Sequence, residues 1–519
     1  MSLKLFLSSI ILGLSIIPSV KANPSSLPVV SAKEFWQAIH ERNPAALEGK
    51  QIPPKYFKQC KKKNTPLNQA ILNEDIAMVR LLIAKGADVN HPDKEKDTPL
   101  HAAVMAADKA ILELLLKCPV ALDSQDKNSR TPLLLAIQNN QYDLVVQLVK
   151  KGANKEKKGI VKYNEQYSYR TPLELAIASS PNIAAYLIEQ GVKLDEKGAQ
   201  GNYPIAEAVW HKREVLVDKM LAQGVPLFYP EAVGFTVLHA AACHEPDYLK
   251  RYLNLAPAGK QNQQDEEGNT PLHYAASVAG PDNIALLLEK GANPFILNRL
   301  GQQPLNCVVN HPNTTHQLAI ASLLIAQGAD VNAMDHQFTL LGNAVLQGKL
   351  ELIKLLLEHK ANVEQLPTNP LYFKRSVSDK LFSRTVKVIN TQTTLLHLAI
   401  VKGQTAIAQF LLAHHPAFVN QKDAFGCTPL HYAAAFDNVA IAHDLLAHGA
   451  RLDIRERTEG YTPIQFAKEM SFVVKNGEEK ICYSGNRVTR LLEKWQKEQK
   501  AKAKAEKIKQ KNEKKKAKK

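Results

Sequence analysis

Histidines and cysteines are the residues best suited to chemistry in this 519-residue sequence. A histidine can act as a general base or a metal ligand, and a cysteine thiolate can act as a nucleophile or a zinc ligand. Five histidines occupy the same place in separate copies of one recurring phrase: His101, His239, His273, His397 and His431. Because each belongs to the turn of its own copy, we expect no two of them to share a metal site or a catalytic site.

The other motifs also argue against catalysis. The six cysteines are Cys60, Cys118, Cys243, Cys307, Cys427 and Cys482. They form no Cys-x-x-Cys pair and are too sparse for a disulfide framework. The chain contains no His-Glu-x-x-His, no Gly-x-Ser-x-Gly and no phosphate-binding glycine loop. We therefore expect a protein that is not an enzyme, with no catalytic residues, no cofactor and no metal. A Cys–His pair that includes Cys482 is the remaining enzymatic alternative.

A phrase close to Thr-Pro-Leu-His-x-Ala-Ala recurs at a nearly fixed period. The residue in its threonine position is, in order, Thr65, Thr98, Thr131, Thr171, Tyr203, Thr236, Thr270, Gln303, Thr339, Thr394, Thr428 and Thr462. Most spacings are 32–36 residues, and two longer ones of 40 and 55 residues mark insertions. This period is typical of a stacked solenoid, and we expect about twelve repeats. Weak copies at Tyr203, Gln303 and Thr339 leave the number open by one or two.

Each copy predicts a pair of helices. The threonine hydroxyl can cap the first helix, and the proline that follows suits its first position, where no N–H is needed. The Ala-Ala pair lets the neighbouring repeat approach closely. A second helix with an apolar side follows and ends at a glycine suited to a left-handed cap. These glycines are Gly86, Gly152, Gly191, Gly224, Gly291, Gly328 and Gly449. No pair can bury its apolar side alone, so neighbouring pairs must share one core.

Over residues 64–497 these repeated residues resemble the ankyrin repeat family. The resemblance implies an all-α solenoid of helix-turn-helix repeats with β-turn or hairpin tips. It also implies that each phrase histidine forms hydrogen bonds within its own turn. Finally, it implies that the turn tips and the outward positions of the first helices line a groove that binds a partner.

Large apolar residues in these groove positions are candidates for binding a partner protein. They are Met105, Trp210, Phe235, Phe338, Phe425, Phe436 and Tyr461. Exposed apolar patches mark interaction sites. The alternative is that each ring packs on the turn of its neighbour and has only a structural role.

The N-terminus has the features of an export signal. Lys4 precedes an apolar run over residues 5–17, Pro18 ends the run, and Val20-Lys21-Ala22 fits a small-residue cleavage site. The run is shorter than the roughly 20 residues that span a bilayer. We expect residues 1–22 to be a signal peptide, with an uncleaved inner-membrane anchor as the alternative. Residues 23–63 are then a linker and an N-terminal capping helix, predicted over 32–47.

Two insertions interrupt the predicted repeats, which occupy residues 64–360 and 394–497. Residues 155–170 form a polar finger with three tyrosines, which is either a tolerated surface loop or a contact to a partner. Residues 361–393 form a longer insertion, in which Val386 and Val388 predict a short strand of a hairpin.

Positive charge is concentrated at the C-terminus. Residues 493–519 contain 13 lysines and 4 glutamates, which is a net charge of +9 out of the formal +16. The basic balance therefore does not mark the whole chain as a nucleic-acid-binding protein. Residues 498–519 form a lysine-rich tail without an apolar stripe. We expect this tail to be solvated and disordered or transiently helical, with attraction to an anionic membrane or nucleic acid as the alternative.

These features predict a monomeric, non-enzymatic protein-interaction scaffold that is exported from a bacterial cytoplasm. An export signal before such an array is unusual for a eukaryotic cytosolic adaptor. We expect a periplasmic or secreted protein, with delivery into a host cell as an effector, or anchoring in the inner membrane, as alternatives. The rival function is electrostatic binding of a membrane or nucleic acid by the tail. An enzyme with an unrecognised site is a weaker rival.

Overall fold

Helix pairs follow one another at the period that the sequence predicts. The computed structural model describes residues 27–163, 166–198, 201–229, 234–335, 338–364, 372–373, 386–387, 393–457, 459–469, 474–476, 479–481 and 486–516. The chain forms two units, residues 1–226 and 227–519, and each is described by itself. The predicted signal peptide at residues 1–22 lies outside the described residues.

The described part of the first unit contains an N-terminal cap and five helix pairs. The cap consists of α1 (Ala32–His40), the 3-10 helix η2 (Pro44–Leu47) and α2 (Pro54–Phe57). The pairs are α3 (Pro66–Leu72) with α4 (Ile76–Ala84), α5 (Pro99–Ala106) with α6 (Lys109–Leu115), α7 (Pro132–Gln138) with α8 (Tyr142–Lys150), α9 (Pro172–Ser179) with α10 (Pro181–Glu189), and α11 (Pro204–Trp210) with α12 (Glu214–Ala222).

Seven further pairs lie in the described part of the second unit. They are α13 (Val237–Ala242) with α14 (Pro246–Leu255), α15 (Pro271–Val278) with α16 (Pro281–Glu289), α17 (Pro304–Cys307) with α18 (Thr314–Ala326), α19 (Leu340–Gln347) with α20 (Leu350–Glu358), α21 (Leu395–Val401) with α22 (Thr405–His414), α23 (Pro429–Ala435) with α24 (Val439–Ala447), and α25 (Pro463–Glu469) with α26 (Asn486–Lys516). The short 3-10 helices are η3 (Lys260–Asn262), η4 (Val308–Asn310) and η5 (Pro416–Asn420). Every one of the twelve predicted copies therefore has its helix pair.

The predicted caps are present. Thr65, Thr131 and Thr339 each accept a hydrogen bond from the backbone N–H three residues later. Glycine is required where one tip meets the next repeat. At Gly268 the φ angle is +79°, and a Cβ atom would lie 2.9 Å from the backbone nitrogen of Arg299. No side chain fits such a gap, so the tip can approach its neighbour only with glycine at this position.

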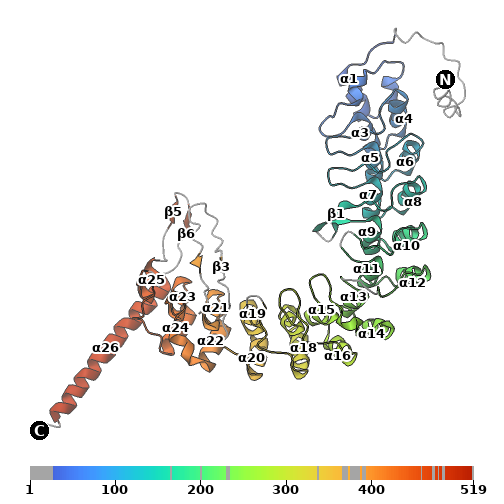
Figure 1. The fold of residues 1–519 in the computed structure, drawn as a ribbon. Coiled ribbons are helices and arrows are strands. Elements are labelled where there is room, and N and C mark those ends of the chain that lie inside the picture. Colours follow the sequence, from blue (N-terminus) through green and yellow to red (C-terminus); the bar gives the residue numbers. More distant parts are fainter. Residues whose placement is uncertain are drawn as a thin grey trace. The chain divides into compact units, whose positions relative to one another are not determined.

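The core runs continuously through each unit. First helices pack on first helices and second helices on second helices, and Figure 1 shows the two rows side by side within each unit. In α15 the small residues Ala275 and Ala276 are completely buried, and in α16 Ile284 and Leu287 are completely buried. The packing therefore confirms that no pair buries its apolar side without a neighbour.

The N-terminal cap differs in part from its prediction. The helix expected over 32–47 ends at His40, and after a turn the segment forms η2 at Pro44–Leu47. Pro44 explains the difference, because the residue before a proline disfavours the helical conformation. A capping box starts α1: Glu34 accepts a hydrogen bond from the backbone N–H of Ser31 at 3.0 Å, and Ser31 accepts one from that of Glu34 at 3.3 Å.

Three antiparallel hairpins interrupt the helices in the part of the chain that the structure describes. The finger at 155–170 contains β1 (Gly159–Tyr163) and β2 (Gln166–Arg170). In the second insertion β3 (Tyr372–Phe373) pairs with β4 (Val386–Lys387), which confirms a strand at Val386. The third hairpin, β5 (Val474–Asn476) with β6 (Glu479–Ile481), lies between the two helices of the last repeat and was not predicted.

The last helix corrects the prediction for the tail. We expected a disordered or transiently helical segment from residue 498, but α26 continues without a break from Asn486 to Lys516. It is the second helix of the twelfth repeat, and the predicted boundary at 498 falls within it. Lysine, glutamate, glutamine and alanine all favour helices, and packing of the first turns on the array supplies the nucleus.

Candidate functional site

The turn tips are held rigidly by one buried aspartate in each of several repeats. Asp126 accepts hydrogen bonds from the backbone N–H groups of Asn128 and Arg130, both at 2.8 Å. Asp93, Asp265 and Asp423 each bind the residues two and four positions later in the same way. Because the backbone is fixed before any partner arrives, the tips can present their side chains with little ordering cost.

Adjacent tips are also joined to each other. The backbone N–H of Lys127 donates to the carbonyl of Glu95 at 3.0 Å, and that of Ile160 in β1 donates to the carbonyl of Asn128 at 3.1 Å. The same bond links Arg299 to Glu267 at 2.8 Å in the second unit. We call the described tips and the exposed sides of the first helices of each unit the tip surface.

The phrase histidines confirm the structural role that the resemblance implies. In four of the five, Nε2 also donates to a backbone carbonyl of the next repeat, as His273 does to Gln302 at 3.0 Å. Since a carbonyl can only accept, Nε2 carries the hydrogen, and Nδ1 accepts from the backbone N–H of the phrase threonine. Within the described residues, no group of three or more His, Cys, Asp or Glu side chains could hold a metal ion.

Burial lowers the pKa of these histidines. The pKa falls to about 4 for His239 and His431 and to about 3 for His397, with desolvation as the largest cause in each case. In the four histidines whose two ring nitrogens both form hydrogen bonds, the neutral imidazole has no spare nitrogen for a substrate. The sequence did not reveal the bond to the next repeat, which ties neighbouring repeats together.

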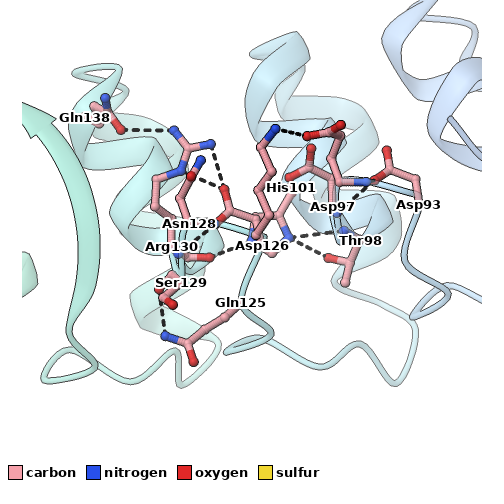
Figure 2. A network of polar contacts seen from close by, with 12 residues as sticks. Asp93, Asp97, Thr98, His101, Gln125, Asp126, Asn128, Ser129, Arg130 and Gln138 are labelled. Carbon is pink, nitrogen blue, oxygen red and sulfur yellow. Dashed lines mark hydrogen bonds and ion pairs between the residues drawn. The ribbon is translucent and has the colours of Figure 1, made fainter. Parts of the chain in front are cut away.

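An acidic side chain stands out on the tip surface of the first unit. Figure 2 shows Asp97 beside Asp93 and Asp126. Arg130 pairs with Asp126 at 2.7 Å, and Lys127 pairs with Glu95, but Oδ1 of Asp97 is buried without a hydrogen-bond partner. Burial, followed by repulsion from Asp93 and Asp126, raises the pKa of Asp97 to about 6. A cation from a partner would relieve this repulsion.

In two other repeats the equivalent position holds a residue that neutralises or bonds the buried aspartate. Arg130 forms an ion pair with Asp126, and Asn269 donates to Asp265 at 3.4 Å. Asp97 instead places a second carboxylate near Asp93, which repels it.

The predicted binding residues divide into exposed and covered side chains. Met105, Trp210 and Phe436 are exposed on first helices or at their ends. Phe425 and Tyr461 are half-buried at tips. Phe235 is also half-buried and lies edge-on to Tyr274, with ring centroids 5.4 Å apart. This contact agrees with the alternative that the ring packs on the neighbouring repeat and has only a structural role.

The expectation that Phe338 faces water is wrong. Its side chain is only 4 % exposed. The reason lies four residues later, where Gly342 stands in the histidine position of its repeat. A Cβ atom at Gly342 would lie 3.2 Å from the Phe338 ring, so the ring occupies space that a phrase histidine fills elsewhere. Phe338 is thus part of the core and is not available to a partner.

Three exposed apolar residues in one tip were missed. Phe295, Leu297 and Leu300 are 50 %, 52 % and 56 % exposed, and all precede α17. The same positions in the preceding repeat hold Asn262, Gln264 and Glu267. Alignment of the repeats with one another would have revealed this cluster, which we call the apolar tip.

Phe295 also interrupts a ladder of side-chain bonds between repeats. In the first unit, Asn90 accepts a hydrogen bond from the backbone N–H of Ala121 in the next repeat, at 2.7 Å. In the second unit, Asn262, Asn332 and Asn420 accept the equivalent bond at 2.7–2.8 Å. A phenylalanine offers no acceptor, so the repeat that contains the apolar tip makes no such side-chain bond to its successor. Its ring instead reaches the next repeat, where a Cβ atom at Gly328 would lie 3.7 Å from Cζ of Phe295.

Comparison with known proteins agrees with this architecture. A family model described as ankyrin repeats (3 copies) matches residues 46–126, 104–198, 205–298, 276–367 and 376–470. The chain is 26% identical over 202 residues to the B-cell lymphoma 3 protein homolog of Mus musculus, covering 37% of this chain and 44% of that protein. It is 29% identical over 197 residues to ankyrin repeat and SOCS box protein 16 of Mus musculus, covering 37% and 43%.

A third relative is the transient receptor potential cation channel subfamily A member 1 of Drosophila melanogaster. The chain is 27% identical to it over 283 residues, which cover 50% of this chain and 22% of the channel. The chain thus spans less than half the length of each of these relatives. The family-model matches cover most of the chain and coincide with the helix pairs of the structure. This chain belongs to the ankyrin repeat family.

Proposed function

We propose that this protein is a non-enzymatic scaffold that captures a partner protein on its tip surface. Ankyrin repeats imply a protein–protein interaction scaffold. The observation that carries the proposal here is the apolar tip, where Phe295, Leu297 and Leu300 are exposed and buried Asn298 already fixes the backbone by accepting hydrogen bonds from the N–H groups of Leu300 and Gln302. Such patches mark interaction sites, and a preordered surface binds without a large entropic cost.

Substitution of Phe425 and Phe436 by alanine together is expected to weaken capture of the partner at least about tenfold, because hot spots are aromatic anchors. The partner is first identified by crosslinking in the native organism, and binding is then measured with purified proteins. Thermal unfolding should change little, since both rings are at least partly exposed. The same measurement on Phe295→Ala with Leu300→Ala tests the apolar tip.

The matched control replaces Val215 and Leu221, two exposed apolar residues on the second helix α12, by alanine. This pair removes apolar area from a second helix, away from the tips and first helices. Capture that is unchanged in both tip variants, or equally reduced in the control, would contradict a binding site on the tip surface.

We further propose that the protein is exported from a bacterial cytoplasm and acts in the periplasm or outside the cell, with delivery into a host cell as the more specific alternative. The apolar run and the small-residue site at Val20-Lys21-Ala22 support this proposal. Sequencing of the mature protein from cell fractions should find Asn23 as the first residue. A cytoplasmic protein that retains residues 1–22 would contradict export.

A further inference from the structure

The helix α26 has a packed part and a free part. Val488 and Leu492 are buried at its start, where the helix packs on α23, α24 and α25. From Lys500 to Gln510 every residue is exposed, and Figure 1 shows this part of α26 extending away from those helices. The free part adds nothing to the core of the array, so packing does not explain its amino-acid composition. Either solubility or binding of a partner must explain it.

Lysines follow one side of this free part. Lys500, Lys504, Lys507, Lys511 and Lys514 are spaced alternately four and three residues apart. At about 100° per residue they fall within roughly 80° of arc and extend over about 21 Å of helix. We call these five residues the lysine stripe.

The opposite side of the same helix carries balanced charges. Glu498, Glu506 and Glu513 lie there together with Lys502, Lys509 and Lys516. Every lysine that is three or four residues from one of these glutamates is outside the stripe, and no stripe lysine has a glutamate at either spacing. Because side chains face each other at these spacings, only the stripe is left without a compensating acid on its own helix.

We propose that the lysine stripe binds flat on an anionic phospholipid surface and holds the ankyrin array beside a membrane. A row of uncompensated lysines on one side of a rigid helix complements a planar layer of negatively charged headgroups. The contact is electrostatic, without insertion. Ile508 is the one large apolar residue between Lys500 and Lys516, and no helix in the described part of the chain is long and apolar enough to cross a bilayer.

The two-sided distribution of charge favours a flat surface over a nucleic acid. A duplex groove surrounds a helix and would bring the three glutamates close to phosphates, whereas a planar surface touches only the stripe. The free part of α26 also contains no arginine and no aromatic residue after Trp495. It therefore lacks the side chains that most often read base edges or stack on bases.

The test measures binding of the full-length chain to vesicles of phosphatidylcholine, with and without about 30% phosphatidylglycerol, at about 0.05 to 0.5 M salt. One variant changes Lys504, Lys507 and Lys511 to glutamine. The matched control changes Lys502, Lys509 and Lys516 to glutamine, which removes the same charge from the opposite side of the same helix. Glutamine keeps a similar helix propensity, and circular dichroism of both variants checks that α26 is retained.

The stripe variant should lose on the order of a hundredfold in affinity for anionic vesicles, and the control less than about tenfold. The control lysines sit across a helix about 10 Å wide, near or beyond the screening length of about 8 Å at physiological salt. Equal losses in the two variants would overturn the proposal, because total charge and not the stripe would then control binding. Absence of wild-type binding at low salt, or tighter stripe-dependent binding to duplex DNA than to vesicles, would also overturn it.

Discussion

Acidification from about pH 7.5 to pH 4 is expected to unfold the repeats that contain phrase histidines. The folded state holds these side chains neutral, with the pKa of His239 and His431 lowered from 6.5 to about 4. Between these values the unfolded chain binds protons that the folded chain does not. The free energy of unfolding therefore falls as the pH falls from 6.5 to 4. The stabilisation that depends on neutral His239 and His431 is fully present above pH 6.5.

The expected effect is roughly 3 kcal/mol for each of these two histidines at pH 4, and His397 adds to it because burial lowers its pKa further. The largest cause is burial, which disfavours the charged imidazolium. In addition, a proton added to Nδ1 would face the N–H donor of the phrase threonine, as at His239, where that distance is 3.1 Å. Urea unfolding followed by circular dichroism at several pH values measures how the free energy of unfolding changes with pH. A flat profile between pH 6.5 and 4.5 would show that these imidazoles are not buried as described.

The chain supplies its own control for this prediction. The first repeat has Asn68 in the histidine position, and its Nδ2 donates to the carbonyl of Asp97 at 2.8 Å. This is the bond that His101 makes to Arg130 one repeat later. His239→Asn with His431→Asn should keep the link between repeats and remove about two protons from the unfolding transition. If the free energy of unfolding of this variant changed with pH as in the wild type, the acid sensitivity would have to come from carboxylates.

The repeats could be predicted from the sequence because their signals are local. A threonine cap, a proline in the first turn and a terminal glycine each act within a few residues, so they fixed the register and all twelve helix pairs. Positions that depend on a neighbour could not be predicted in the same way. Phe338 looked exposed because its own turn is on the surface, and only the missing side chain at Gly342 lets the ring turn inward.

The exposure of the candidate binding residues was predicted only in part. Trp210, Met105 and Phe436 are exposed as expected, but Phe295 was recognised only after the bonds of equivalent positions were compared. For the lysine-rich tail the sequence analysis left a disordered and a transiently helical state open, and the structure shows a continuous helix. A lysine-rich composition is typical of disordered tails. Whether such a tail becomes helical depends on whether a packed segment before it nucleates the helix.

Leu287→Ala is expected to lower the free energy of unfolding of the second unit by about 2–5 kcal/mol. Leu287 is completely buried in α16, which packs between α14 and α18. Removal of its side chain takes away apolar burial and leaves a cavity that three layers of helices must close. Because stability in a solenoid is a sum of nearest-neighbour terms, the damage should be greatest in the adjacent repeats.

Hydrogen exchange of the variant should therefore show lost protection in α14, α16 and α18 before it appears in α22 or α24. Leu297→Ala is the matched control, since it removes the same atoms from a side chain that is 52 % exposed and should change stability by less than about 0.5 kcal/mol. Equal effects of the two substitutions would contradict the assigned register, because a one-residue shift in α16 would carry Leu287 off the buried side. Uniform loss of protection along the whole unit would instead contradict stability built from neighbouring pairs.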